Sequence, residues 1–157
     1  MTQETIAPPG QGLAPVLDIH NLRTELLIDG QWRAVVRNVS LTIHRNETLA
    51  LVGESGSGKS MTALSVLKLL PTKISRIGAG QILFEGKDLA SLSERDLRRI
   101  RGNRIAMIFQ EPMTSLNPLH TIEKQIGETL LIHKGLSGTA ARARIIELLR
   151  LVGLGAQ

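Results

Sequence analysis

The stretch from Gly53 to Ser60 places glycines, a lysine and a serine at spacings that can bind phosphate. It reads GESGSGKS, which fits the pattern G-x-x-x-x-G-K-[ST]. Glycines let successive backbone N–H groups curl around an anion, and a helix beginning near Gly58 would add the positive end of its dipole. Lys59 can reach the β- and γ-phosphates as a mobile charge, and the Ser60 hydroxyl can ligate Mg²⁺. The pattern therefore predicts a phosphate-binding loop with a place for a magnesium ion.

The alternative is a flexible Gly/Ser linker that happens to contain a lysine. At average residue usage the pattern would arise by chance in a chain of this length about once in 200. An apolar run before the loop and a helical pattern after it argue further against a linker. Every residue of the stretch is therefore a predicted ligand of the phosphates: Gly53, Glu54, Ser55, Gly56, Ser57, Gly58, Lys59 and Ser60.

The elements that must position this loop are a strand and a helix. Residues Glu47–Val52 read ETLALV, a short apolar run that predicts a buried strand. After the loop, Leu64, Leu67 and Leu70 share one helical face, and Pro71 ends the pattern. The predicted order is strand, glycine loop, helix.

Two β-rich runs precede these elements, Val16–Ile28 and Trp32–Ile43. Between them lies Asp29-Gly30, a dipeptide that suits a tight hairpin. The folded part is therefore expected to open with an antiparallel flap near Val16. Residues 1–15 mix Pro, Gly and Gln without periodicity, which predicts a flexible leader.

The rest of the chain alternates strand and helix patterns. Ser91 and Glu94 form a capping-box pattern for a short basic helix that ends at Gly102. Two longer helical patterns follow, and Gly135 is expected to cap the first of them. The predicted strands are Gly80–Phe84 and Arg104–Phe109, and the predicted helices are His120–Lys134 and Ala140–Val152.

Composition narrows the class of protein. The 157 residues carry a net charge of +5, which suggests an anionic partner such as a phosphate, a nucleic acid or a membrane surface. Three aromatic residues, one Trp and two Phe, are too few for the stacking platforms of single-strand nucleic-acid binders. The absence of Cys excludes disulfide frameworks and thiolate metal sites.

A phosphate loop alone leaves kinases, GTPases, helicases and transporter ATPases open. The segment IAMIFQEPMTSLNP, residues 105–118, distinguishes among them. It resembles the Q-loop segment of ABC-transporter nucleotide-binding domains of the oligopeptide, dipeptide and nickel importer family, and most closely that of peptide importers. Together with ETLALVGESGSGKS this resemblance covers residues 16–155.

The resemblance implies an α/β fold, the P-loop NTPase core of an ABC ATPase domain. Residues 16–157 would be its N-terminal portion, with the antiparallel β flap, the phosphate loop and the start of the helical subdomain. In the family, the signature motif, the acidic strand with the catalytic Glu and the switch His follow the region corresponding to Leu154. Glu111 and Glu123 lie in the Q-loop segment and on a helical face, so neither is expected to replace that Glu.

The resemblance also implies roles for individual residues. Gln110 would contact Mg²⁺ or the attacking water and report γ-phosphate occupancy, and Lys59 would spread the charge that develops in the reaction. A lone Gln would more simply cap a strand, but its fourteen-residue context favours the family role. Residues 111–119 would form part of the surface that docks the membrane subunit.

Adenine and α-phosphate contacts follow from the same resemblance. The family stacks adenine on an aromatic side chain of the flap, and the aligned residue here is Leu26, with Trp32 nearby. The alternative for Trp32 is that it only covers apolar surface of an edge strand. Met61 stands where many relatives have Thr, so its backbone N–H would make the α-phosphate contact.

The expected protein is therefore an ATPase that binds ATP and Mg²⁺ and powers import of peptides or similar small solutes across the bacterial inner membrane. Its implied partners are integral membrane permease subunits, a second nucleotide-binding domain and, indirectly, a periplasmic solute-binding protein. It would sit peripherally on the cytoplasmic face and bind no nucleic acid. The chain is expected to be the first part of a longer protein, and this segment alone to lack ATP turnover. The alternatives are a truncated, non-catalytic nucleotide-binding fragment and a DNA-associated ABC ATPase.

Overall fold

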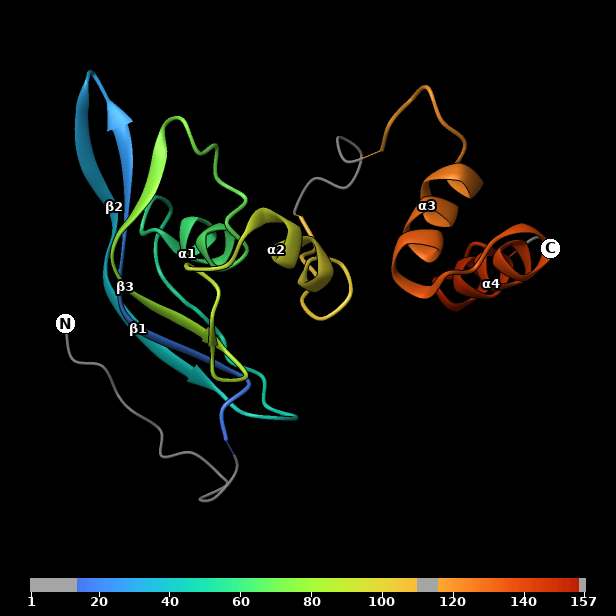
Figure 1. Ribbon diagram of the computed structural model, residues 1–157, viewed down its shortest axis with the longest axis horizontal. Helices are drawn as coiled ribbons and strands as arrows, with labels where there is room; N and C mark the ends of the chain where they lie inside the picture. Colours follow the sequence, from blue (N-terminus) through green and yellow to red (C-terminus); the bar gives the residue numbers. More distant parts are fainter. Residues whose placement is uncertain (1–13, 110–115, 156–157) are drawn as a thin grey trace. The chain divides into compact units, whose positions relative to one another are not determined.

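The computed structural model describes residues 14–109 and 116–155. The chain divides into two compact units, residues 1–93 and 94–157. The first unit contains β1 Leu17–Ile28, β2 Gln31–Ile43, α1 Lys59–Val66, β3 Ser75–Phe84 and β4 Lys87–Asp88 (Figure 1). The second contains α2 Glu94–Ile100, α3 Ile122–Lys134 and α4 Gly138–Leu151.

The strands of the first unit form one antiparallel sheet in the order β2-β1-β3-β4. β1 and β2 pair from Leu17↔Ile43 to Ile28↔Gln31, which leaves Asp29 and Gly30 as the two-residue turn. Both have positive φ, 52° and 73°, as a tight hairpin turn with the twist of the flanking strands requires. The predicted flap is therefore confirmed. β3 begins five residues earlier than the predicted Gly80.

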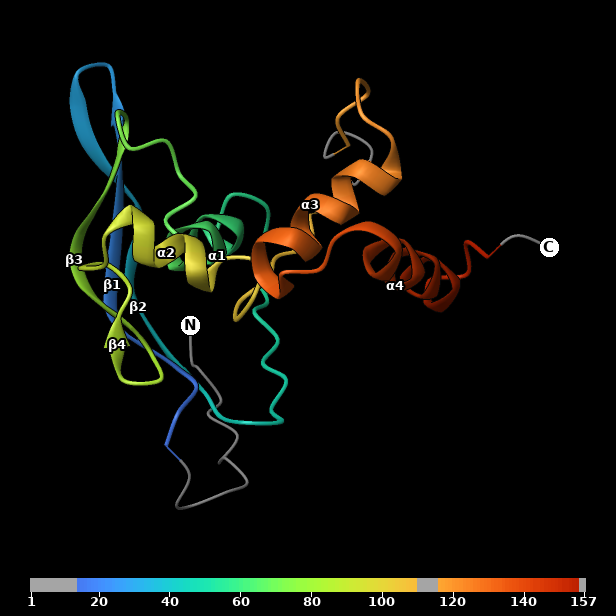
Figure 2. The ribbon, with the colours of Figure 1, turned by 45° about the vertical axis from the view of Figure 1, so that its right-hand side comes forward.

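Helix α1 covers one face of this sheet (Figure 1, Figure 2). Buried side chains on the sheet include Ile19, Leu22, Val36 and Ile82, and Val66 of α1 is buried as well. Successive residues of a strand point to opposite faces of the sheet, so the buried residues of each strand identify the face that the helix covers. The phosphate loop connects to this helix directly, so the sheet positions the loop through α1.

The prediction of a buried strand at Glu47–Val52 is wrong for this structure. No strand of the described residues pairs with the segment, and the side chains of Leu49, Leu51 and Val52 are exposed. An apolar run shows what a segment could bury, but a strand also needs a neighbouring strand to satisfy its backbone groups. None of the described strands supplies one here.

The strand predicted at Arg104–Phe109 is wrong for the same reason. Within residues 94–109 the only β structure is an isolated bridge between Arg101 and Ile105. Ile108 and Phe109 are exposed, Ile108 almost completely. Both missing strands are the most apolar predicted strands of the chain, and both require pairing that local sequence cannot provide.

In the second unit, the ends of α3 agree with the sequence pattern. The Thr121 hydroxyl accepts a hydrogen bond from the Lys124 N–H at 3.2 Å, and Gly135 ends the helix with φ 65°. The predicted cap at Gly135 is therefore confirmed. Helices α3 and α4 pack around Leu130, Ala141 and Ile145.

The capping box predicted for α2 is wrong. The helix begins at Glu94, and the Ser91 hydroxyl instead donates to the Asp88 carbonyl at 2.9 Å. Because Glu94 is the first residue of the helix, Ser93 is the residue that directly precedes it, and Ser91 lies too far upstream to be the N-cap; Ser91 belongs to the turn after β4.

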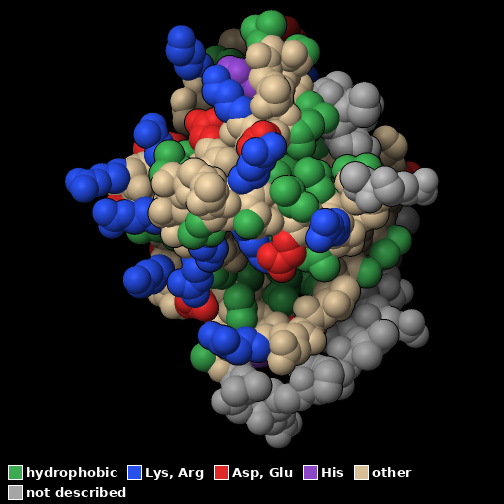
Figure 3. Space-filling view, turned by 90° about the vertical axis from the view of Figure 1, so that its right-hand side faces the viewer, with side chains coloured by type: hydrophobic (Ala, Val, Ile, Leu, Met, Phe, Trp, Pro, Cys, Tyr) green, Lys and Arg blue, Asp and Glu red, His purple; other side chains and the backbone are tan. Residues whose placement is uncertain are grey.

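Hydrophobic side chains reach the surface beside Lys and Arg on the face shown in Figure 3. Among the described residues, no helix is long and apolar enough to cross a membrane.

Candidate phosphate-binding site

Helix α1 begins at Lys59, directly after the loop, so its first backbone N–H groups face the loop. Gly58 occupies the capping position with φ 95° and supplies no side-chain hydrogen bond. The first turn of α1 contains no Asp or Glu. The N-terminus of this helix therefore keeps its positive character for an external anion.

Gly58 also packs against the backbone of β2. A Cβ atom built on Gly58 would lie 2.9 Å from the carbonyl oxygen of Val35, so only glycine fits. The N–H and the hydroxyl of Thr62 both donate to the Gly58 carbonyl, at 2.8 and 2.9 Å. The end of the loop is thus held between β2 on one side and the first turn of α1 on the other.

The ammonium group of Lys59 lies over the beginning of the same loop. Its Nζ donates to the carbonyl oxygens of Gly53 and Glu54, each at 2.7 Å, and to the Ser57 hydroxyl at 3.3 Å. An ammonium has three protons, and the third bond is the long one. A phosphate oxygen can accept a hydrogen bond from that third N–H while the two short bonds hold Lys59 in place.

The loop closes tightly around this lysine. A Cβ on Gly53 would lie 2.7 Å from the Ser57 hydroxyl oxygen, and the Ser57 N–H donates to the Glu54 carbonyl at 3.2 Å. Gly56 has φ 81°. The structure therefore brings the predicted loop residues together into one concave turn at the start of α1.

The donor set fits a phosphate chain with Mg²⁺. Backbone N–H groups and an ammonium suit phosphate oxygens, and Ser60, the second residue of α1, offers a hydroxyl. No group of three or more acidic or His side chains that could hold a metal occurs among the described residues. Among the described residues, the site would therefore offer a magnesium ion the Ser60 hydroxyl, with oxygens of the phosphates and water beside it.

The two candidate adenine contacts lie on opposite faces of the sheet. Leu26 pairs with Arg33, and Trp32 pairs with Leu27, the next residue of β1. Directly paired residues of antiparallel strands share a face, whereas neighbours along one strand alternate. The Thr24 hydroxyl bonds to Ser65 of α1, which places Thr24 and Leu26 on the face that α1 covers. Trp32 lies on the other face.

On that other face, a carboxylate joins two arginines. Arg23 Nε donates to Glu25 Oε1 at 2.8 Å, and Arg76 Nε donates to Oε2 at 2.7 Å. The side chain of Glu25 is only 8% exposed. The hydrogen bond from Arg76, with help from Arg23 and against the effect of burial, lowers the pKa of the Glu25 carboxyl below its usual value.

The other predicted site residues divide by position. Met61 lies in the first turn of α1, where its backbone N–H is one of the early groups of the helix. Gln110 and the segment 111–115 of the predicted docking surface lie outside the described residues. Sequence reasoning missed Val35, Thr24 and Ser65. For Thr24 a signal existed, because it is a polar residue between Leu22 and Leu26 at the two-residue spacing of one strand face.

Comparison with known proteins agrees with this fold. The profile of the family described as ABC transporter matches residues 36–157. The chain belongs to the ABC transporter family.

Similar proteins include a peptidoglycan transport ATP-binding protein of Agrobacterium fabrum, 54% identical over 140 residues that cover 89% of this chain and 26% of the relative. A putative peptide import ATP-binding protein of Brucella ovis is 50% identical over 145 residues, 89% of this chain and 43% of the relative. An uncharacterised ABC transporter ATP-binding protein of Escherichia coli is 53% identical over 88% of this chain and 26% of the relative. The chain thus spans less than half the length of these relatives.

Among solved structures, the dimeric structure of a bacterial ABC transporter cassette, MJ0796, is similar in fold. Its TM-score is 0.74 at 24% identity, and the match covers 87% of this chain and 57% of the cassette. The same cassette in a post-hydrolysis state bound to ADP and phosphate matches equally well. The described α/β architecture is therefore that of part of an ABC cassette.

Proposed function

We propose that this chain binds Mg-ATP at the Gly53–Ser60 loop and supplies part of an ATPase that powers peptide import across the bacterial inner membrane. The observation that carries the proposal is the geometry of Lys59, held over the loop carbonyls with one N–H only weakly engaged, at an α1 N-terminus without acidic residues. The names of the relatives, which include peptide import and peptidoglycan transport, support the class of cargo.

In this proposal each loop residue has a separate task. Backbone N–H groups of residues 53–58 and of Met61 bind phosphate oxygens, and Lys59 donates a hydrogen bond from its third N–H to oxygens of the β- and γ-phosphates. Leu26, on the face covered by α1, contacts adenine. Ser60, with Gln110 as a further ligand, would hold Mg²⁺, which would supply positive charge beside the phosphates.

The same proposal assigns the rest of the reaction. Lys59 offsets charge that grows on the γ-phosphate as water attacks in line, and Gln110 orients that water. The ATP would be sandwiched against a second nucleotide-binding domain, of the same or another chain. Closure of the two domains would drive the transporter, and hydrolysis would reset it.

The proposed partners are integral membrane permease subunits, contacted through the segment after Gln110, and a periplasmic solute-binding protein that acts indirectly. The proposed location is peripheral, on the cytoplasmic face of the inner membrane. No nucleic acid takes part, so binding of this protein to DNA in a salt-sensitive manner would contradict the proposal.

The test is a titration of the full encoded protein with a fluorescent ATP analogue in the presence of Mg²⁺. Lys59→Ala should weaken binding at least about 100-fold, since a charge-assisted contact to phosphate is lost in a site that also depends on it for loop closure. Lys73→Ala removes an exposed lysine of the same unit and serves as the charge-matched control. Equal affinities of the Lys59 and Lys73 variants would overturn the phosphate-loop assignment.

A further inference from the structure

A buried hydrogen bond joins strand β1 to helix α1, 41 residues apart in the chain. The hydroxyl oxygens of Thr24 and Ser65 lie 2.8 Å apart, and the residues are 1% and 3% exposed. The Ser65 hydroxyl donates its single proton to the Met61 carbonyl at 2.6 Å. Thr24 must therefore be the donor to Ser65.

This bond is one anchor between α1 and the β1–β2 hairpin. Another is the close packing of Gly58 against the Val35 carbonyl at the N-terminal end of the helix. The two anchors involve different strands and opposite ends of α1, whose eight residues move as one short rod. Together they set both the position and the tilt of the helix that carries Lys59.

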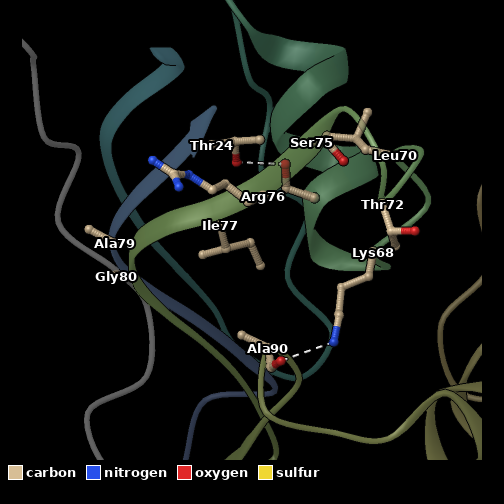
Figure 4. Close-up of a pocket in the computed structure, with 11 residues that line it drawn as sticks. Thr24, Lys68, Leu70, Thr72, Ser75, Arg76, Ile77, Ala79, Gly80 and Ala90 are labelled. Carbon is tan, nitrogen blue, oxygen red and sulfur yellow. Dashed lines mark hydrogen bonds between the residues drawn. The ribbon is translucent and has the colours of Figure 1, made fainter. Parts of the chain in front are cut away.

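Beside the Thr24–Ser65 bond, packing against α1 is incomplete on one side, although Ser65 and Val66 themselves are buried. A cavity of about 320 Å³ lies there, lined by Thr24, Ser65, Lys68 and Ile77 among others (Figure 4). Lys68 closes part of it by donating from Nζ to the Ala90 carbonyl at 3.0 Å. Because side chains do not fill this space, the hydroxyl pair adds directly to the packing that holds this part of α1 against β1.

Leu26, the proposed adenine contact, follows Thr24 by two residues on the same face of β1. The bond from Thr24 to Ser65 therefore sets the separation between the adenine end of the site and the phosphate end. We propose that Thr24 is a positioning residue that aligns the base-contacting strand with the phosphate loop. This inference rests on the proposed function.

Two ligands separate this role from simple support of the fold. Mg-ATP spans both ends of the site, whereas magnesium tripolyphosphate contacts only the loop. In the full encoded protein, Thr24→Val keeps the shape of the side chain but removes the donor, and Ser65 keeps its bond to Met61. Thr24→Ser keeps the hydroxyl. Calorimetric titration with each ligand, and thermal melting of each variant, complete the design.

Thr24→Val should bind Mg-ATP about three- to tenfold more weakly, the range of one hydrogen bond, and bind tripolyphosphate within about twofold of the wild type. Thr24→Ser should restore the ATP affinity. The inference is overturned if Thr24→Val weakens both ligands equally, if it changes neither, or if Thr24→Ser behaves like Thr24→Val.

Other outcomes of the same titrations would contradict the proposed function itself. If the wild type binds neither ligand, or binds both independently of Lys59, the phosphate site itself is absent and the role of Thr24 falls with it. If the wild type binds tripolyphosphate in a Lys59-dependent manner as tightly as ATP, the phosphate site stands. The role of Thr24 is then overturned, because no adenine contact exists to align.

Discussion

The guanidinium of Arg76 lies over the ring of Trp32, 4.3 Å from its centroid, on the sheet face opposite α1. The same arginine donates from Nε to the Glu25 carboxylate. One side chain of β3 thus joins a residue of β1 and a residue of β2. The only tryptophan of the chain has a cation over one ring face, which favours a structural role over base stacking.

Amino-acid substitutions on the two faces of the sheet test where adenine binds. Leu26→Tyr should tighten Mg-ATP binding about fivefold, since base–aromatic stacking contributes upward of about 1 kcal/mol. Leu27→Tyr, a matched control on the opposite face, and Trp32→Leu should leave the affinity within about twofold. Calorimetry on the three variants measures this. A tenfold loss in Trp32→Leu alone would instead place adenine on the Trp32 face.

Glu25 should make the stability of the folded protein depend on pH. Its pKa in the folded state lies below the usual 4.5, so its contribution is fully present above pH 4.5 and is lost as the pH falls through the lowered value. Glu25→Gln should therefore lower the Tm at pH 7, and its difference from the wild type should shrink as the pH falls below 4.5.

Thermal melts at several pH values check this prediction. Glu128→Gln, an exposed exchange on α3, is the control and should follow the wild type throughout. A Tm difference between Glu25→Gln and the wild type that stays constant from pH 7 to pH 3 would mean that the Arg23 and Arg76 bonds do not stabilise the ionised carboxylate.

Substitution of two glycines with similar backbone angles distinguishes the cost of backbone strain from the cost of a steric clash. Gly58 and Gly86 have φ of 95° and 78°, but a Cβ would meet the Val35 carbonyl at the first and nothing within 4 Å at the second. Gly86→Ala should cost about 1 kcal/mol of unfolding free energy, from the left-handed backbone alone. Gly58→Ala should cost about 1–3 kcal/mol more, and should also weaken nucleotide binding because the loop must shift. Urea unfolding of both variants gives the comparison, and equal losses would show that β2 does not confine the loop.

Local structural features of this protein could be predicted from the sequence without knowledge of the fold. The turn at Asp29-Gly30, the loop from Gly53 to Ser60 and the cap at Gly135 each depend on the conformational freedom of glycine or on hydrogen bonds within a few residues. Such preferences act before any distant contact forms. For the same reason, the helices of residues 122–134 and 138–151 lie close to their predicted ranges.

Strand pairing between distant segments could not be predicted from the sequence in this way. The apolar runs at 47–52 and 104–109 have the composition of buried strands, yet none of the described strands pairs with either. A strand differs from a helix because its backbone hydrogen bonds must come from another segment. Composition therefore predicts a capacity for strand formation, and the available neighbours decide whether it is realised.

The sequence by itself determined that the chain carries a glycine-rich loop, a lysine and a serine in one local turn before a helix, and hence where phosphate would bind. Only the tertiary structure decided what surrounds that turn. The register of β1 and β2 beside the turn places Leu26 and Trp32 on opposite faces, α1 covers the Leu26 face, and the sheet brings Thr24 to Ser65. The loop could be read in advance because its geometry comes from neighbouring residues, whereas the face that α1 covers and a contact across 41 positions depend on packing that no local pattern encodes.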